Sequence, residues 1–186
     1  MITIPILLLL ALYFSVKAYN TIIRKRNQVE NALAGTDAIL KKRYDLIPNL
    51  VSAVKQYMTY EEATLSKITS LRTSLLEQNS NVSERLEKEN QLSSLLGKVL
   101  VAVENYPDLK SNTNMLHLQQ SLMEIEEQIS AARRSYNASV MDYNNSIEAF
   151  PANIIAGFMG AKRKPSFEIN TVERETVSVK DLFDAK

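Results

Sequence analysis

The sequence lacks cysteine and tryptophan, and it has only one histidine and four glycines among its 186 residues. Without cysteine, a disulfide framework and a thiolate metal site are both excluded. His117 alone is too little for a histidine-based metal site or a catalytic triad, and its place beside Leu118 in a helical pattern is typical of a surface or packing residue. The scarcity of glycine, with abundant Leu, Ser, Glu, Lys and Asn, predicts an all-α fold.

An excess of charge of one sign is also missing, because 22 Lys and Arg stand against 21 Asp and Glu. The signs are mixed along the chain, so we expect no nucleic-acid partner. Glu124, Glu126 and Glu127 cluster, but they lie on one predicted helix and no Glu-x-x-His occurs in the sequence, so we expect no metal and no cofactor. The scattered Ser, Tyr and Glu residues do not form a catalytic pattern, and we predict that the protein is not an enzyme.

What the sequence does contain is an apolar run, residues 2–16, which ends at Lys17 and is followed by a basic cluster at residues 24–26. A helix of that length rises about 22 Å, whereas a hydrocarbon core is about 30 Å thick, so a membrane span must extend to Tyr19. We therefore predict a transmembrane anchor at residues 1–19. The side chains expected to contact lipid are Ile4, Leu8, Leu12, Val16 and Lys17.

The basic residues stand after the apolar run rather than before it. By the positive-inside rule, this predicts a single-pass plasma-membrane protein with a short N-terminus outside and the remaining chain in the cytoplasm. The alternative is a cleaved signal peptide and an exported protein, because Val16-Lys17-Ala18 has the small-x-small pattern of a cleavage site.

Residues 20–150 form one domain's length of helical periodicity. Pro48 lacks an N–H and clashes with a preceding helical turn, so we predict a turn at residues 44–48, with Asp45 as N-cap of a second helix. A third helix is expected from a cap at Asn81 to Pro107, and a fourth begins after a cap at Ser111 or Asn112. The fourth helix carries a heptad seam with one stutter: Leu118, Leu122, Ile125, Ile129, Ala132, Tyr136, Val140, Tyr143, Ile147 and Phe150.

Several short motifs together resemble the LemA family of bacterial membrane proteins. They are Tyr19-Asn20, Lys42-Arg43-x-Asp45-Leu46-Ile47-Pro48-Asn49-Leu50-Val51, Tyr106-Pro107-Asp108, Arg133, Tyr136-Asn137, Tyr143-Asn144 and Phe150-Pro151. The resemblance covers residues 19–167 and departs from the family pattern at Leu33, Gln56 and Tyr60. It implies a single-pass anchor, an antiparallel up-and-down four-helix bundle in the cytoplasm and no established enzymatic activity. Periodicity alone also permits a kinked long helical hairpin.

Tyr136-Asn137 and Tyr143-Asn144 recur seven residues apart, which places both tyrosines on the seam and both asparagines on one flank of it. Core tyrosines with hydrogen-bonded hydroxyls explain this pattern, and a ligand-binding ladder is the functional alternative. An inward Arg133 needs a carboxylate, so we predict an ion pair with Asp37 or Asp45.

Residues 151–167 form an amphipathic and basic segment, and residues 168–186 are expected to form a flexible tail. If four helices alternate in direction, the segment returns to the bilayer. An interfacial contact with anionic lipid would then involve Ile154, Ile155, Phe158, Lys162, Arg163 and Lys164. The alternative is that the apolar side chains only cover the open end of the bundle core.

Two functional hypotheses follow. The first is a protein-interaction or scaffold module, whose partners are membrane lipid and other membrane or cytoplasmic proteins of unidentified kind. The second is an enzyme acting on a substrate near the membrane. An outward-facing or secreted bundle is the topological alternative to both.

Overall fold

The computed structural model describes residues 3–58, 62–77 and 82–167. These residues form helices and contain no strand, so the all-α prediction is confirmed. The elements are α1 (Thr3–Lys55), α2 (Glu62–Leu76), α3 (Val82–Val103), α4 (Pro107–Lys110), α5 (Thr113–Glu148) and α6 (Ala152–Phe158). The expected cap at Asn81, the departure from the family pattern at Tyr60 and the expected flexible tail lie outside the described residues.

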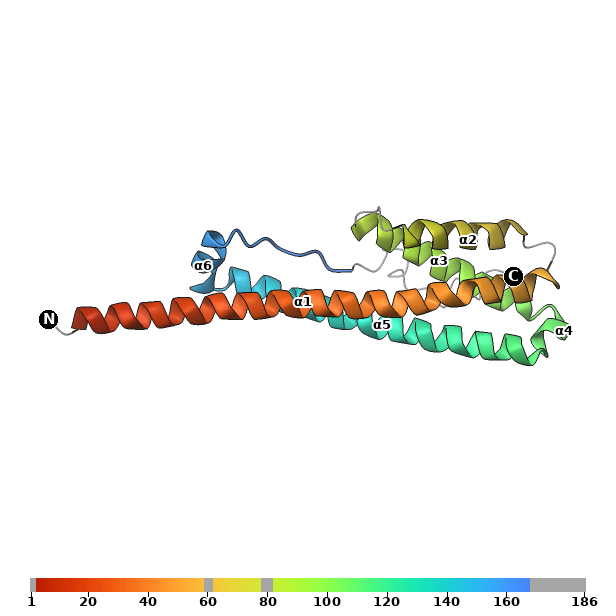
Figure 1. Ribbon diagram of the computed structural model, residues 1–186, viewed down its shortest axis with the longest axis horizontal. Coiled ribbons are helices and arrows are strands. Elements are labelled where there is room, and N and C mark those ends of the chain that lie inside the picture. The colour runs from red at the N-terminus through yellow and green to blue at the C-terminus, as the bar shows by residue number, and fades with distance from the viewer. Residues whose placement is uncertain (1–2, 59–61, 78–81, 168–186) are drawn as a thin grey trace, which may run out of the picture.

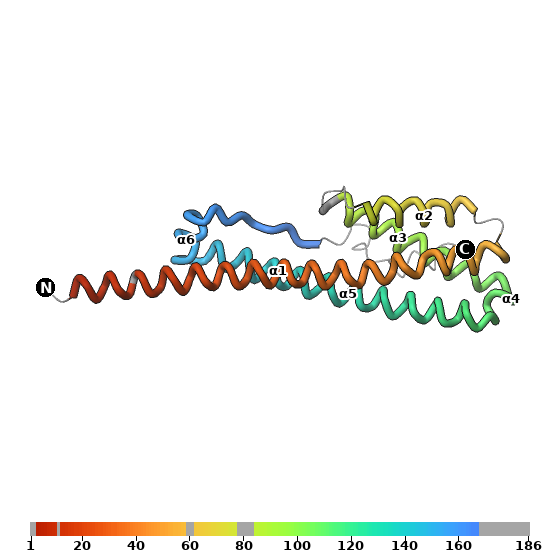
Figure 2. The backbone as a smooth tube through the Cα atoms, in the orientation of Figure 1, coloured from red at the N-terminus to blue at the C-terminus, as the bar shows by residue number. Residues whose placement is uncertain are grey.

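Two long helices organise the molecule, with α1 and α5 lying side by side (Figures 1 and 2). They are antiparallel, because Lys25 of α1 meets Asp142 of α5 and Arg43 of α1 meets Glu126 of α5. We call the end of the pair nearest Thr3 the anchor end and the opposite end the distal end. The α2–α3 hairpin covers the distal half of the pair, and α6 packs on both long helices near the anchor end.

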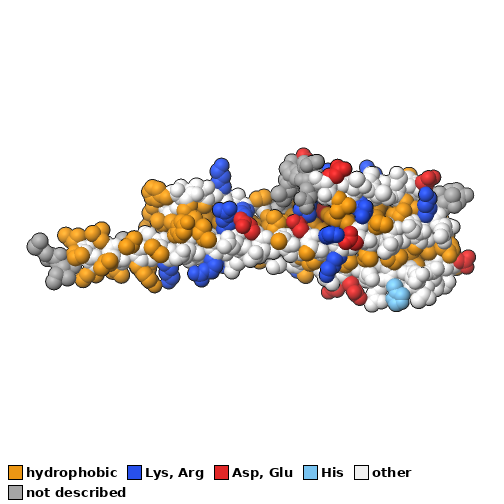
Figure 3. Space-filling model, in the orientation of Figure 1, with side chains coloured by type: hydrophobic (Ala, Val, Ile, Leu, Met, Phe, Trp, Pro, Cys, Tyr) orange, Lys and Arg blue, Asp and Glu red, His pale blue; other side chains and the backbone are white. Residues whose placement is uncertain are grey.

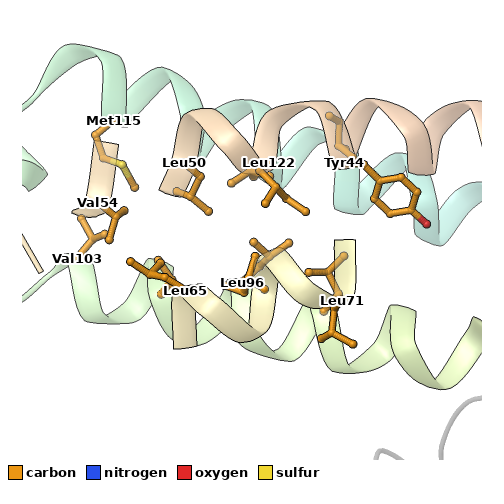
Figure 4. Packing of buried hydrophobic residues seen from close by; sticks show 14 of the residues in the cluster. Tyr44, Leu50, Val54, Leu65, Leu71, Leu96, Val103, Met115 and Leu122 are labelled. Atoms are coloured by element: carbon orange, nitrogen blue, oxygen red, sulfur yellow. The ribbon is translucent and has the colours of Figure 1, made fainter. Parts of the chain in front are cut away.

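The interior consists of two groups of apolar side chains. The distal core draws on α1, α2, α3 and α5, and Figure 4 shows Leu50, Leu122 and Leu96 approaching one another from three of these helices. The anchor-end core is smaller and joins Ile22 and Val29 of α1 to the α5 seam and to α6. Each fully buried Leu, Ile or Val contributes about 1.5–3 kcal/mol relative to exposure, so the distal core contributes most of the stability.

The predicted turn at residues 44–48 is wrong, because α1 continues through Pro48 to Lys55. Pro48 cannot donate to the carbonyl of Tyr44, which is four residues earlier. Arg72 of α2 takes over this role, and its Nε donates to the Tyr44 carbonyl oxygen at 2.7 Å. A side chain from a neighbouring helix therefore supplies the hydrogen bond that the proline removes.

The chain reverses later than predicted, between Lys55 and Glu62. Leu50 and Val54 lie on α1, before the reversal, and the buried residues of α2 are Leu65, Ile68, Leu71 and Leu75. Asp45 is not an N-cap, since it is exposed and pairs with Lys41 one turn earlier at 3.0 Å.

The fourth predicted helix corresponds to α5. Its N-cap is Asn112, whose side chain accepts hydrogen bonds from the backbone N–H groups of Asn114 and Met115. The seam is buried at Leu122, Ile125, Ile129, Tyr136, Val140, Tyr143 and Ile147. Phe150 departs from it and is 81% exposed, because α5 ends at Glu148 and the heptad register ends with it.

Candidate functional site at the anchor end

The first part of α1 is apolar, and its side chains are largely exposed. Among the described residues it belongs to the one helix that is long and apolar enough to cross a membrane, with a mean hydropathy of 1.8 over its most apolar window. The predicted lipid contacts Ile4, Leu8, Leu12 and Val16 are all exposed, and so is Lys17. The first buried residue along α1 is Ile22, at 1% exposure. The protein thus begins to cover its own helix just after the predicted span.

Helix α6 supplies this cover. Ala156 is buried against the anchor-end core, and Met159 and Ala161 pack beside it. Two apolar side chains one turn apart on α6 point the other way, because Ile154 and Phe158 are 54 and 87% exposed. Phe150, which precedes α6, is 81% exposed. Apolar side chains accordingly gather over α6 in Figure 3, with basic side chains beside them.

The segment after α6, residues 161–167, is here called the strap. Gly160, with φ +62°, turns the chain out of α6 into the strap, and this left-handed conformation favours glycine. Two asparagines of α5 hold the strap. Asn144 donates to the carbonyl of Lys164 at 3.0 Å and accepts from its N–H at 2.9 Å. Asn137 does the same with Phe167 at 2.9 and 2.7 Å.

The spacing of the two asparagines matches the spacing of the two strap residues that they bind. Seven residues of helix rise about 10.5 Å, and three residues of extended chain span about 10 Å. Asn137 and Asn144 therefore meet Phe167 and Lys164 in register, and each satisfies both backbone polar groups of one strap residue. The sequence left open a ligand-binding ladder, and the structure places the chain's own strap on these asparagines.

Both tyrosines of the repeat are buried, as the explanation by core tyrosines requires. The Tyr136 hydroxyl donates to the carbonyl of Pro165 at 3.1 Å, and burial raises the pKa of Tyr136. Its ring lies 4.6 Å from the ring of Phe167, measured between centroids. Tyr143 lies under Lys164, whose Nζ is 5.9 Å from the ring centroid. The repeat thus serves the core and the strap together.

The predicted ion pair of Arg133 is not formed. Asp37 pairs with Arg85 of α3 at 2.6 Å, and Asp45 pairs with Lys41. Arg133 instead donates to Asn90 of α3 at 3.1 Å and lies 6.0 Å from the centre of the Phe167 ring. The periodicity of the sequence predicts that Arg133 lies on the inner face of its helix, but it does not identify the residue that Arg133 contacts there.

Basic side chains are concentrated at the anchor end. Residues 1–30 and 140–167 contain seven Lys and Arg but three Asp and Glu, a net charge of +4 in a chain whose total is +1. Glu30 accepts from Arg26 at 3.0 Å and from Lys164 at 3.4 Å, and these contacts lower its pKa. Arg163 pairs with Glu148 at 2.8 Å, with both side chains largely exposed.

A cavity of about 330 Å³ lies among these groups. Its apolar part is made by Ile22, Tyr143 and Met159. Its polar part is made by Arg26 and the basic triplet Lys162, Arg163 and Lys164. An apolar floor below several cations suits a molecule that carries both an anionic and an apolar part.

A second polar cluster lies in the distal half and escaped the sequence analysis. Arg43 is 0% exposed, and its guanidinium donates to Glu89, to Ser93 at 2.6 Å and to Glu126 at 2.6 Å. The Tyr44 hydroxyl also donates to Glu89, and burial is the main cause of the raised pKa of Tyr44. The cluster joins α1, α3 and α5.

This cluster is suited to structure rather than chemistry, because its carboxylates are occupied by Arg43 and Tyr44 and Glu89 is 2% exposed. One signal could have revealed it. Glu89 stands three residues from both Leu86 and Leu92, and this spacing places a charge on the same side of a helix as two leucines. Within the described residues, no group of three or more His, Cys, Asp or Glu could hold a metal ion.

The remaining motif residues lie apart from this site. Pro48 and Asn49 are exposed on α1, and Asp108 is exposed on α4. Tyr106 packs half-buried against the distal core, and Pro107 is the first residue of α4. Of the predicted interfacial residues, Ile155 is half-buried, whereas Ile154 is exposed.

Comparison with known proteins identifies the family of the chain. The model of the LemA family matches residues 32–180. The chain belongs to the LemA family. The protein LemA of Metamycoplasma hominis is 28% identical over 163 residues, which cover 88% of this LemA-family chain and 74% of that protein. Magnetosome protein MamQ 2 of Paramagnetospirillum magneticum is 24% identical over 190 residues, with coverages of 89% and 70%. Magnetosome protein MamQ of Magnetospirillum gryphiswaldense is 23% identical over 174 residues, with coverages of 80% and 64%.

Proposed function

We propose that this LemA-family chain is a single-pass plasma-membrane protein whose cytoplasmic helices act as an interaction or scaffold module for other proteins, without enzymatic activity. The observation that carries the proposal is the continuity of α1, which passes from the exposed apolar segment into both cores without a break. The 36 residues from 20 to 55 rise about 54 Å, so α1 holds the distal core well away from the bilayer.

The proposed module is an antiparallel up-and-down four-helix bundle made by α1, α2, α3 and α5. Contacts along the helices support these directions. On α1, Asp37 meets Arg85 and Arg43 meets Glu89, so α1 and α3 run the same way. The contacts of α5 with α1 and α3 run in the opposite order, and α2 meets α1 after the reversal at its end.

A binding role needs exposed faces, and the distal half has them. Met123 is 67% exposed, and Leu116 and Val101 are also exposed. Leu116 and Met123 stand seven residues apart and therefore share one face of α5. Polar groups that enzymes use are instead engaged with one another, as in the Arg43 cluster.

Topology is tested with single-cysteine variants, which are unambiguous because the chain has no cysteine. Two variants, one with a short cysteine-containing tag before residue 1 and the other Ser94→Cys, are expressed in intact cells and treated with a membrane-impermeant maleimide. We expect the tag cysteine to be labelled at once and Ser94→Cys only after permeabilisation. The reverse pattern, or a soluble product without its first residues, would place the helices outside.

The scaffold role is tested by placing a photo-crosslinking amino acid at Met123 in the full chain in native membranes. We expect one adduct of defined mass that saturates with expression and also forms from Leu116. A crosslinker at exposed Lys42 is the matched control on another helix, and it should give a different pattern or none. Absence of a saturable adduct at Met123, Leu116 and Val101 would contradict the proposal.

A further inference from the structure

We propose that the outer face of α6 and the basic start of the strap form a second membrane contact, which binds anionic phospholipid in the leaflet on the side of the helices. The contact residues are Phe150, Ile154, Phe158, Lys162 and Arg163. The inference rests on the proposed topology, because the cytoplasmic leaflet is the anionic one. It adds a lipid-binding site that the scaffold role does not require.

Position along α1 places this face at the level of the lipid headgroups. The span ends at Tyr19, and α6 already covers α1 at Ile22, about 4.5 Å further along the helix. A short element packed beside a transmembrane helix at this height lies where headgroups meet acyl chains. Figure 1 shows α6 next to the N-terminal part of α1 and far from the distal end.

The apolar side chains of α6 are not needed to close the anchor-end core. That core is covered by Ala156, Met159 and Ala161, while Phe158 stays 87% exposed. The alternative from the sequence, in which Ile154, Ile155 and Phe158 only cover the end of the core, therefore does not account for the exposure of Ile154 and Phe158. Ile154 and Phe158 on the exposed face of α6, with the exposed Phe150 just before the helix, are typical of an interfacial contact.

Charge selects an anionic lipid. Lys162 has no ion-pair partner among the described residues, and the Arg163 pair with Glu148 is an exposed pair of the kind that contributes little. Both cations remain accessible to a phosphate. They border the cavity whose floor is Ile22 and Met159, so one lipid can place its phosphate on the cations and its glycerol and upper acyl chain on the apolar floor.

Asn137 and Asn144 hold the strap, and with it the basic residues, beside α6. Asn144 binds both backbone groups of Lys164, next to the contact cations, and Asn137 fixes the end of the strap at Phe167. Asn144 is therefore a positioning residue, which holds the basic triplet beside α6 without touching lipid.

The test uses the absence of native tryptophan. Full-length Phe158→Trp is reconstituted into vesicles of phosphatidylcholine, with or without phosphatidylglycerol, that contain lipid brominated near the top of the acyl chain. We expect bromine to quench this tryptophan more strongly in the vesicles with phosphatidylglycerol. Met123→Trp, an exposed apolar position at a distance from the anchor, is the matched reporter and should be unaffected.

Charge is tested in the same reporter by changing Lys162, Arg163 and Lys164 to Gln. Each basic residue near an anionic surface favours contact about fivefold, so this triple variant should lose the difference between the two vesicle compositions. Changing exposed Lys42, Lys67 and Lys98 to Gln removes the same charge elsewhere and should leave the difference intact. Asn144→Ala should reduce the difference without altering the quenching measured in phosphatidylcholine alone.

Two results would overturn the proposal. One is equal quenching of Phe158→Trp and Met123→Trp in the anionic vesicles. The other concerns the difference in quenching between the two vesicle compositions. This difference would persist when Lys162, Arg163 and Lys164 are changed to Gln, or it would be lost to the same extent when Lys42, Lys67 and Lys98 are changed to Gln. Failure of the scaffold proposal would appear separately, as missing crosslinks at Met123, and would leave the quenching unchanged.

Discussion

The contact between Arg72 and the Tyr44 carbonyl makes a specific prediction about Pro48. In the native chain, Arg72→Ala removes a charged donor from a backbone oxygen that Pro48 cannot satisfy. Hydrogen bonds to charged groups contribute about 1.5–3 kcal/mol, and Arg72 is half-buried, so we expect a loss of about 2 kcal/mol in the free energy of unfolding.

Pro48→Ala should act in the opposite direction. Alanine is about 3 kcal/mol more favourable than proline inside a helix, and the greater freedom of the unfolded chain offsets up to about 1 kcal/mol of this gain. The backbone N–H that this substitution restores would also donate to the Tyr44 carbonyl, so that Arg72 is no longer its only donor. In the Pro48→Ala background, Arg72→Ala should therefore cost about 1 kcal/mol, which leaves a coupling energy of about 1 kcal/mol between the two sites.

The four proteins are compared by urea unfolding of the full chain in detergent micelles, followed by circular dichroism. Urea is preferred because guanidinium would compete with Arg72 and screen charges. Arg134→Ala, which removes an exposed arginine of α5, is the control and should change stability by less than about 0.5 kcal/mol in either background. If Arg72→Ala costs the same with proline and with alanine at position 48, the compensation described here does not operate.

Three further outcomes are expected. Ile129→Asp places a charge in the seam and should destabilise the protein by more than about 4 kcal/mol, whereas Met141→Asp on the exposed side should be nearly neutral in the same urea unfolding experiment. Arg43→Met should lower the free energy of unfolding by about 3–5 kcal/mol, because Glu89 is left buried without its cation. Adding Glu89→Leu should recover most of this loss, and no recovery in urea unfolding would contradict a paired role. Burial raises the pKa of Tyr44, so the contribution of Tyr44 to the free energy of unfolding is complete below about pH 10 and is lost as the pH rises further. Tyr44→Phe should therefore reduce the decline in stability between about pH 9 and 11, and an unchanged decline would refute this.

The features that the sequence predicted well are those set by nearby residues. The seam of α5 repeats within the helix itself, and the Asn112 cap binds N–H groups two and three residues away. The anchor is recognisable from its apolar run alone. Local periodicity and capping chemistry are sufficient in such places, because the partners lie on the same helix.

The features that could not be predicted from the sequence depend on side chains from distant parts of the chain. The rule that proline ends a helix failed because the compensating donor, Arg72, is 28 residues away from Tyr44. Arg43 belongs to one of the short motifs, but its burial depends on Glu89 and Glu126 from two other helices. Each missed feature is therefore a polar group whose partner the sequence alone does not identify.

The two halves of the long helix pair are covered by different physical means, and this bears on how the protein can respond to a membrane. The distal half is sealed by the apolar side chains of α2 and α3. The anchor half is covered by α6 and by a strap whose backbone groups are bound by Asn137 and Asn144. A net contribution of about 1 kcal/mol for each such hydrogen bond is small beside the burial of a whole hairpin, so the strap is the part that opens at the lowest cost. In the proposed lipid contact, the charge of the bilayer surface would therefore act, through Lys162 and Arg163, on the cover of the long helices that opens at the lowest cost.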